Sequence, residues 1–115
     1  MRIVEGIATV EDVNAFVADL SAIGEEQGCA VQAFSARLVA GRSHLETAVE
    51  RAHRSLERDR NIADDPAVEI LLWAAGRRQI DQAMGLGVTA GTGPVAVVID
   101  GPDEDAEERA AEEVR

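Results

Sequence analysis

The sequence has little of what cross-linked, metal-binding or membrane-spanning proteins require. It contains one cysteine, Cys29, so no internal disulfide can form, and we expect a buried, unreactive thiol. His44 and His53 are its two histidines, and neither has the spacing to Cys29 of a metal site. We therefore predict no metal and no cofactor.

Long apolar runs are also absent. None approaches the roughly 18 residues that a membrane-spanning helix needs, and the N-terminus lacks the basic and apolar regions of a secretion signal. We expect a cytoplasmic protein that does not enter a membrane. The length of 115 residues and the hydrophobic content of 46% indicate one domain with one core.

Positive charge is scarce and comes entirely from arginine. The 22 acidic residues outnumber the 11 arginines, giving a net charge of −11, which at first argues against a nucleic-acid partner. The charge is unevenly distributed, however. Residues 37–78 contain eight arginines and seven acids, a net charge of +1, so the rest of the chain carries −12. The middle of the chain therefore remains a candidate for binding an anion.

Hydrophobic periodicity predicts alternating strands and helices. A strand, or a short hairpin broken at Gly6, is expected at residues 2–10, and further strands are expected at 30–36 and 94–99. Helices are expected at residues 11–23 with an exit at Gly24 or Gly28, at 44–58, from Pro66 to Gly76, and at 77–84. This order predicts an α+β domain in which a small sheet of about three or four strands packs against a layer of helices.

Two helix starts carry specific signals. Ser43 and Glu46 have the spacing of a capping box, in which each side chain pairs with a free backbone N–H of the other residue. Asp65 followed by Pro66 predicts a second start, because proline at the first helical position gives up an N–H that has no partner in any case. Residues 1–102 form the expected domain, and residues 103–115 are expected to be a solvated acidic helix or a frayed tail.

Motifs of catalysis are missing. The glycine-rich segments 85–87 and 91–93 lack the lysine and the following helix of a phosphate-binding loop, so turns are the better interpretation. For His44 we favour a structural hydrogen bond over a role as a ligand. No nucleophile stands in a motif with a base, and we predict that the protein is not an enzyme.

An arginine cluster is the remaining signal. Its simplest interpretation is a solvated helix face on which Glu50 pairs with Arg54 four residues later. The alternative is a site for a single-stranded nucleic-acid end beside Trp73, because guanidinium groups both neutralise phosphate and stack on bases. The candidate RNA-binding residues are Arg42, His44, Arg51, Arg54, Arg58, Arg60, Arg77 and Arg78.

Three ordered motifs resemble a known family. They are Gly41-x-x-His44-Leu45, Arg60-Asn61-Ile62 and Gly76-x-Arg78-Gln79-Ile80, within a similarity that covers about residues 30 to 100. Together they resemble the small subunit of the KEOPS tRNA-modification complex, the archaeal Cgi-type family that includes the animal PRPK-binding protein TPRKB. The residues of this sequence that match functional or structural positions of the family's motifs are Gly41, His44, Arg54, Arg60, Asn61, Glu69, Arg78 and Gln79.

The resemblance implies a non-catalytic α+β subunit. Such a subunit binds the Bud-type atypical kinase of KEOPS, supports its activity, and holds the single-stranded 3′ CCA end of tRNA during threonylcarbamoyladenosine modification. Glu69 and Gln79 have an equally good structural interpretation, holding the central helices together. A protein-interaction module without RNA binding is the alternative function, and a small enzyme is a third.

Overall fold

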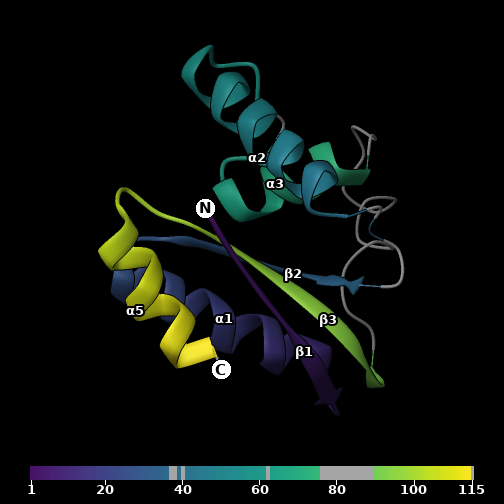
Figure 1. Cartoon of the computed structure of the whole chain (residues 1–115). Helices are drawn as coiled ribbons and strands as arrows, with labels where there is room; N and C mark the ends of the chain where they lie inside the picture. Colours follow the sequence, from purple (N-terminus) through teal and green to yellow (C-terminus); the bar gives the residue numbers. More distant parts are fainter. Residues whose placement is uncertain (37–38, 40, 62, 76–89, 115) are drawn as a thin grey trace.

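The computed structural model describes residues 1–36, 39, 41–61, 63–75 and 90–114. In this part of the chain, a three-stranded antiparallel sheet packs against helices, which confirms the predicted α+β class (Figure 1). The helices are α1 (Val13–Gln27), α2 (Arg42–Glu57), α3 (Pro66–Ala75) and α5 (Glu104–Val114). The helix expected at residues 77–84 lies outside the described residues.

The sheet places the last strand of the chain in the middle. Its strands are β1 (Arg2–Val10), β2 (Ala30–Ser35) and β3 (Gly91–Asp100), in the order β1-β3-β2. β3 pairs with β1 from Gly91 to Ile99 and with β2 from Val95 to Asp100. β1 runs without interruption through Gly6, so the break expected there does not occur.

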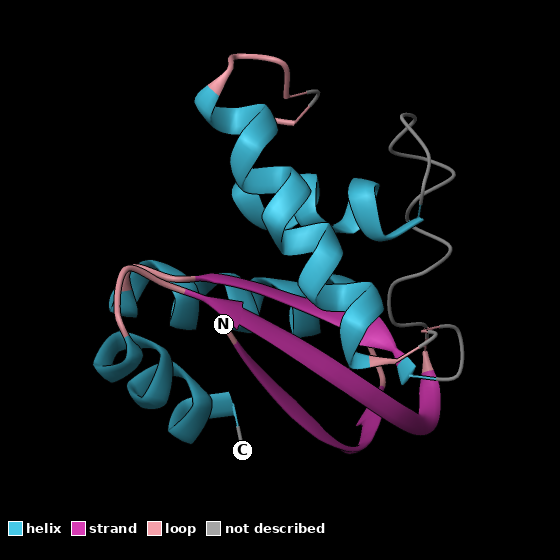
Figure 2. Cartoon of the chain, turned by 45° about the horizontal axis from the view of Figure 1, so that its top comes forward, coloured by secondary structure: helices cyan, strands magenta, loops and turns pink. Residues whose placement is uncertain are grey.

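Helices cover both faces of the sheet, as Figure 2 shows. Alternate residues of β3 point to opposite faces. Ala96 and Val98 pack in a cluster with α2 and α3, whereas Val97 and Ile99 pack in a second cluster with α1 and α5. All four are buried, which explains why β3 reads as a continuous apolar run.

Helix α1 begins and ends at polar or glycine residues. The Asp12 carboxylate accepts hydrogen bonds from the N–H groups of Asn14 and Ala15, and Gly28 ends the helix at φ +70°. Gly24, the other expected exit, is buried inside the helix. A Cβ at Gly24 would lie 2.6 Å from the carbonyl oxygen of Cys29, so glycine lets the chain enter β2 directly against the helix.

The predicted capping box of α2 is wrong. The helix begins at Arg42, its N-cap is Gly41, and no side chain caps it. Gly41 adopts φ +136°, a conformation that favours glycine, and this turn starts the helix two residues too early for Ser43 to act as the cap. Glu46 instead pairs with Arg42 at 2.6 Å.

The start of α3 is confirmed. The carboxylate of Asp65 accepts a hydrogen bond from the N–H of Ala67 at 2.9 Å, and Pro66 is the first helical residue. The preference of an Asp-Pro pair for the start of a helix therefore agrees with the position of α3 in the fold.

The C-terminal segment is a packed helix, so the expectation of solvation or fraying is wrong. Ala106, Ala110 and Ala111 of α5 are buried, and the last two lie in the cluster on the α1 face of the sheet. Small side chains let this helix approach closely without the large apolar residues that mark a buried face in a sequence. The buried Glu107 accepts a hydrogen bond from the N–H of Gly101 at 2.9 Å and pairs with the amino group of Met1.

The burial of α5 predicts a large cost for Ala110→Asp. A carboxylate at this fully buried position has no partner, and we expect a loss of about 3 kcal/mol in the free energy of unfolding. The measurement is urea unfolding followed by Trp73 fluorescence. Ala18→Asp, at an exposed position of α1, is the matched control and should cost less than about 1 kcal/mol. Equal effects of the two substitutions would contradict the packing of α5.

Candidate nucleic-acid interface

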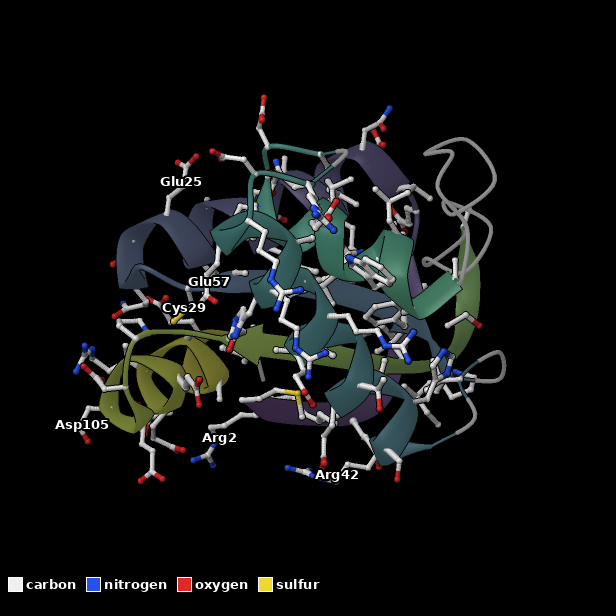
Figure 3. All side chains as sticks on the ribbon, turned by 90° about the horizontal axis from the view of Figure 1, so that it is seen from above. Arg2, Glu25, Cys29, Arg42, Glu57 and Asp105 are labelled. Carbon is white, nitrogen blue, oxygen red and sulfur yellow. The ribbon has the colours of Figure 1, made fainter. Side chains whose placement is uncertain are left out.

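Three arginines share the exposed side of α2. Arg51, Arg54 and Arg58 are three and four residues apart, a spacing that places side chains on one face of a helix. The opposite face of α2 is buried in the core through residues such as Val49 and Ala52. The core therefore fixes which way the arginines point, and Figure 3 looks down onto this side of the molecule.

A tight turn brings a fourth arginine back toward the helix. Asp59 adopts φ +53°, and its N–H donates to the carbonyl of Leu56 at 3.3 Å. The N–H of Arg60 then donates to the carbonyl of Ser55 at 2.8 Å. These bonds satisfy carbonyls at the end of α2 and return the chain alongside the last turn.

The four arginines and the tryptophan surround one groove. Its volume is about 500 Å³. Its lining residues are Arg51, Arg54, Ser55, Arg58, Arg60 and Trp73. Sequence analysis predicts the arginines and the neighbourhood of Trp73, and the structure brings these residues together.

A buried carboxylate forms the base of the groove. Glu69 of α3 is 2% exposed and accepts hydrogen bonds from Ser55 Oγ at 2.5 Å, from the N–H of Ala63 at 3.2 Å and from Trp73 Nε1 at 3.2 Å. Each donor comes from a different segment: α2, the loop before α3, and α3 itself. The Glu69 carboxylate therefore joins α2 to α3, which is the structural role considered for this residue.

The same network orients the aromatic ring. Trp73 Nε1 lies 3.2 Å from Glu69 and 3.3 Å from Ser55 Oγ, so the indole N–H points inward. The Arg51 guanidinium carbon lies 5.9 Å from the centre of the Trp73 ring, within range of a cation–π interaction. The groove thus contains an indole held at one edge with a guanidinium over the ring.

Most of the positive charge in the groove is not neutralised. Arg54 pairs with Glu50, which confirms the predicted i,i+4 pair. Among the described residues, Arg51, Arg58 and Arg60 have no carboxylate within 4.0 Å. An anion entering the groove would meet three guanidinium groups that form no ion pair in this part of the chain.

Two of the predicted RNA-binding residues lie elsewhere. Arg42 is at the start of α2, about 24 Å along the helix from Arg58 at the rise of an α-helix, and pairs with Glu46. His44 Nε2 donates to the carbonyl of Ala74 at 2.5 Å, a structural hydrogen bond between α2 and α3. The structure does not bring either residue to the groove.

The remaining family-type positions have structural contacts or are not described. Gly41 supplies the turn before α2, and the Asn61 side chain donates to the carbonyl of Ala63 at 2.9 Å inside the loop before α3. Arg77, Arg78 and Gln79 lie outside the described residues.

Ser55 is the lining residue that sequence analysis does not single out. It is 6% exposed and donates to Glu69, although serine is usually a surface residue. The available signal is its spacing. Ser55 follows Ala48 and Ala52 at helical intervals, and a polar residue on an otherwise apolar stripe needs a buried partner.

The described residues contain no cluster of three or more histidine, cysteine or acidic side chains that could hold a metal ion. Nor does this part of the chain include a helix long and apolar enough to cross a membrane. Burial raises the pKa of the Cys29 thiol, and the nearby carboxylates of Glu107, Asp100 and Asp103 raise it further. A raised pKa keeps the thiol protonated and poorly nucleophilic at neutral pH.

Comparison with known proteins adds no relative. No known protein family matches the chain, and a search of curated proteins finds no match. The resemblance to the KEOPS small subunit therefore rests on its three ordered motifs alone.

Removal of the Glu69 carboxylate should destabilise the helix pair. Glu69→Ala removes the acceptor of three hydrogen bonds at a buried position, and we expect the free energy of unfolding to fall by about 3 kcal/mol. Denaturant unfolding measures this loss, and Trp73 emission should change because its N–H loses an acceptor. Glu46→Ala, at an exposed ion pair of α2, should cost less than about 1 kcal/mol. A Glu69→Ala protein as stable as this control would show that the network contributes nothing.

Cys29 should react slowly with iodoacetamide. Only the thiolate reacts, and a raised pKa lowers its fraction at neutral pH, so the folded protein should be alkylated more slowly than the same chain in urea. The rate should rise with pH and reach its midpoint above pH 9.0, the ordinary pKa of a thiol. A midpoint below that value would contradict the assigned environment.

Proposed function

We propose that this chain is a non-catalytic adaptor of a KEOPS-type complex that acts in the cytoplasm, binding the 3′ CCA end of tRNA in the arginine groove and a Bud-type atypical kinase elsewhere. The observation that carries the RNA half of the proposal is the groove itself. Four arginines and the one tryptophan of the chain, from two helices and a turn, line a single hollow.

The chemistry of the groove suits a single-stranded end. Its volume of about 500 Å³ lies within the range of small-ligand sites and is large enough for an unpaired nucleotide. Arg58 and Arg60 form no ion pair with the described residues and can contact phosphates, and a base can stack on the guanidinium of Arg51, which is backed by the ring of Trp73. Single-stranded ends have the unstacked bases that such a site recognises.

The acidity of the rest of the protein supports localised binding. A net charge of −11 repels RNA from most of the surface, so phosphates should be attracted only where arginines gather. The expected affinity is therefore modest and strongly dependent on salt.

The kinase half of the proposal comes from the family resemblance. The three motifs occur in family order, and two of them contribute directly to the α2–α3 unit through Gly41, His44 and Asn61. Co-elution of the chain with a purified Bud-type kinase on gel filtration tests this half independently of RNA.

Charge reversal in the groove should weaken RNA binding. We expect Arg58→Glu to reduce the affinity for whole tRNA by about tenfold or more at low salt, because a phosphate contact becomes a repulsion. The measurement is a mobility shift with whole tRNA and with the same tRNA lacking its CCA end. Trimming should weaken binding to the wild-type protein and have little further effect on the variant.

The control is Arg109→Glu, which makes the same charge change at an exposed residue of α5. It should change the affinity by less than about twofold. Equal losses in both variants would mean that net charge alone governs binding. Failure of the wild-type protein to bind either RNA at any salt concentration would favour the alternative, a protein-interaction module whose arginine face is solvated.

A further inference from the structure

In the described part of the chain, the sheet has two edge strands, β1 and β2, and the edge of β2 is the second surface of interest. In the described part of the chain, β2 has β3 on one side and no strand on the other. An edge strand turns alternate backbone N–H and C=O groups away from the sheet, where they can pair with another chain. Figure 1 shows α1 on one side of the sheet beside β2 and α3 on the other.

Two hollows lie along this edge and share a boundary. One, of about 730 Å³, lies where the end of α1, the end of α2 and the start of α3 meet the turn after β3. The other, of about 380 Å³, lies between α1, β2 and α3. Both are lined by Ser21, Val31, Asp65 and Ala67. They therefore form one trench, which we call the β2 trench.

The β2 trench is apolar inside and acidic at its margins. Apolar side chains from four elements line it, among them Val17, Val31, Leu56, Val68 and Ile70. Its charged lining residues are Glu25, Asp65 and Asp100, and His53 is hydrogen-bonded to the Asp100 carboxylate. No arginine is among the described residues that line either hollow. Figure 3 labels Glu25 and Cys29, both lining residues, at the same end of the molecule.

We propose that the β2 trench binds an extended basic segment of a partner protein, which adds a strand to the free edge of β2. The backbone N–H and C=O groups of β2 that face the edge supply hydrogen bonds that do not depend on the partner's sequence. Side chains of an added strand alternate between the two faces, so one set faces α1 and the other faces α3. The carboxylates of Glu25 and Asp65, one on each side, attract arginine or lysine in that strand.

Charge also decides against a second copy of this chain as the occupant. In an antiparallel pair of two β2 strands, the end of one β2 that lies next to Asp100 would be beside the opposite end of the other, so the net charge of each chain is what opposes this dimer. With a net charge of −11 on each chain, that arrangement is repulsive. RNA is disfavoured for the same reason. The length of β2, six residues, sets the length of the bound segment at about the same number.

The trench and the arginine groove lie on different sides of α2. His53 and Leu56 line the trench, whereas Arg51, Arg54 and Arg58 line the groove. The two surfaces have opposite charge, and none of their described lining residues is shared. Peptide binding in the trench therefore does not depend on the proposed RNA binding, and Arg58→Glu should leave peptide binding unchanged.

The test uses a fluorescein-labelled hexapeptide of alternating arginine and valine, measured by fluorescence anisotropy at moderate salt. We expect saturable binding to the full chain. A peptide with the same side chains but a methyl group on every backbone nitrogen should bind at least about tenfold more weakly, because it cannot donate hydrogen bonds to β2. This comparison separates strand addition from attraction of a basic peptide to an acidic protein.

Matched variants locate the site. Ser21→Trp should block the trench where the hollows meet and abolish binding, whereas Ala22→Trp, at the next exposed residue of α1, should not. Glu25→Arg should weaken binding by about tenfold and Glu26→Arg, outside the lining, by less than about twofold. Absence of binding, equal binding of the methylated peptide, or normal binding by Ser21→Trp would each overturn the proposal.

Discussion

Strand β3 must bury side chains on both of its faces, and the rest of the fold depends on that requirement. Ala96 and Val98 need the cover of α2 and α3, while Val97 and Ile99 need that of α1 and α5. Because β3 comes late in the sequence and lies between β1 and β2, neither helix layer has its full core until β3 is in place. Both candidate surfaces are consequences of this arrangement, since β3 fixes α2 above the sheet and leaves β2 at its edge.

The arginine groove depends on a buried carboxylate that itself has no access to a ligand. Glu69 is acceptor to Ser55, Ala63 and Trp73, so it holds α2, the following loop and α3 in one geometry. An unpaired carboxylate at this depth would be costly, and its donors would be equally costly without it. The same hydrogen bonds therefore stabilise the core and fix the shape of the groove.

The distribution of charge gives the small domain two surfaces with opposite preferences. Arginines point away from the core on one side of α2, and acids rim the β2 trench on the other. A ligand attracted by one surface is repelled by the other, because phosphate and basic peptide have opposite charge. The helix α2 separates the two surfaces.

Local patterns in the sequence determined the strands, the start of α3 at Asp65 and Pro66, and the pairing of Glu50 with Arg54. These features depend on neighbours within a few residues, so they are visible without the fold. Only the tertiary structure decided three others. Gly41 displaced the start of α2 from the capping box, and the alanines of α5 became core because small side chains pack closely against α1 and the sheet. The predicted RNA-binding arginines do not form one site, because Arg42 and Arg58 lie at opposite ends of α2. Their positions in the sequence give this distance in space only once the helix and its packing are known.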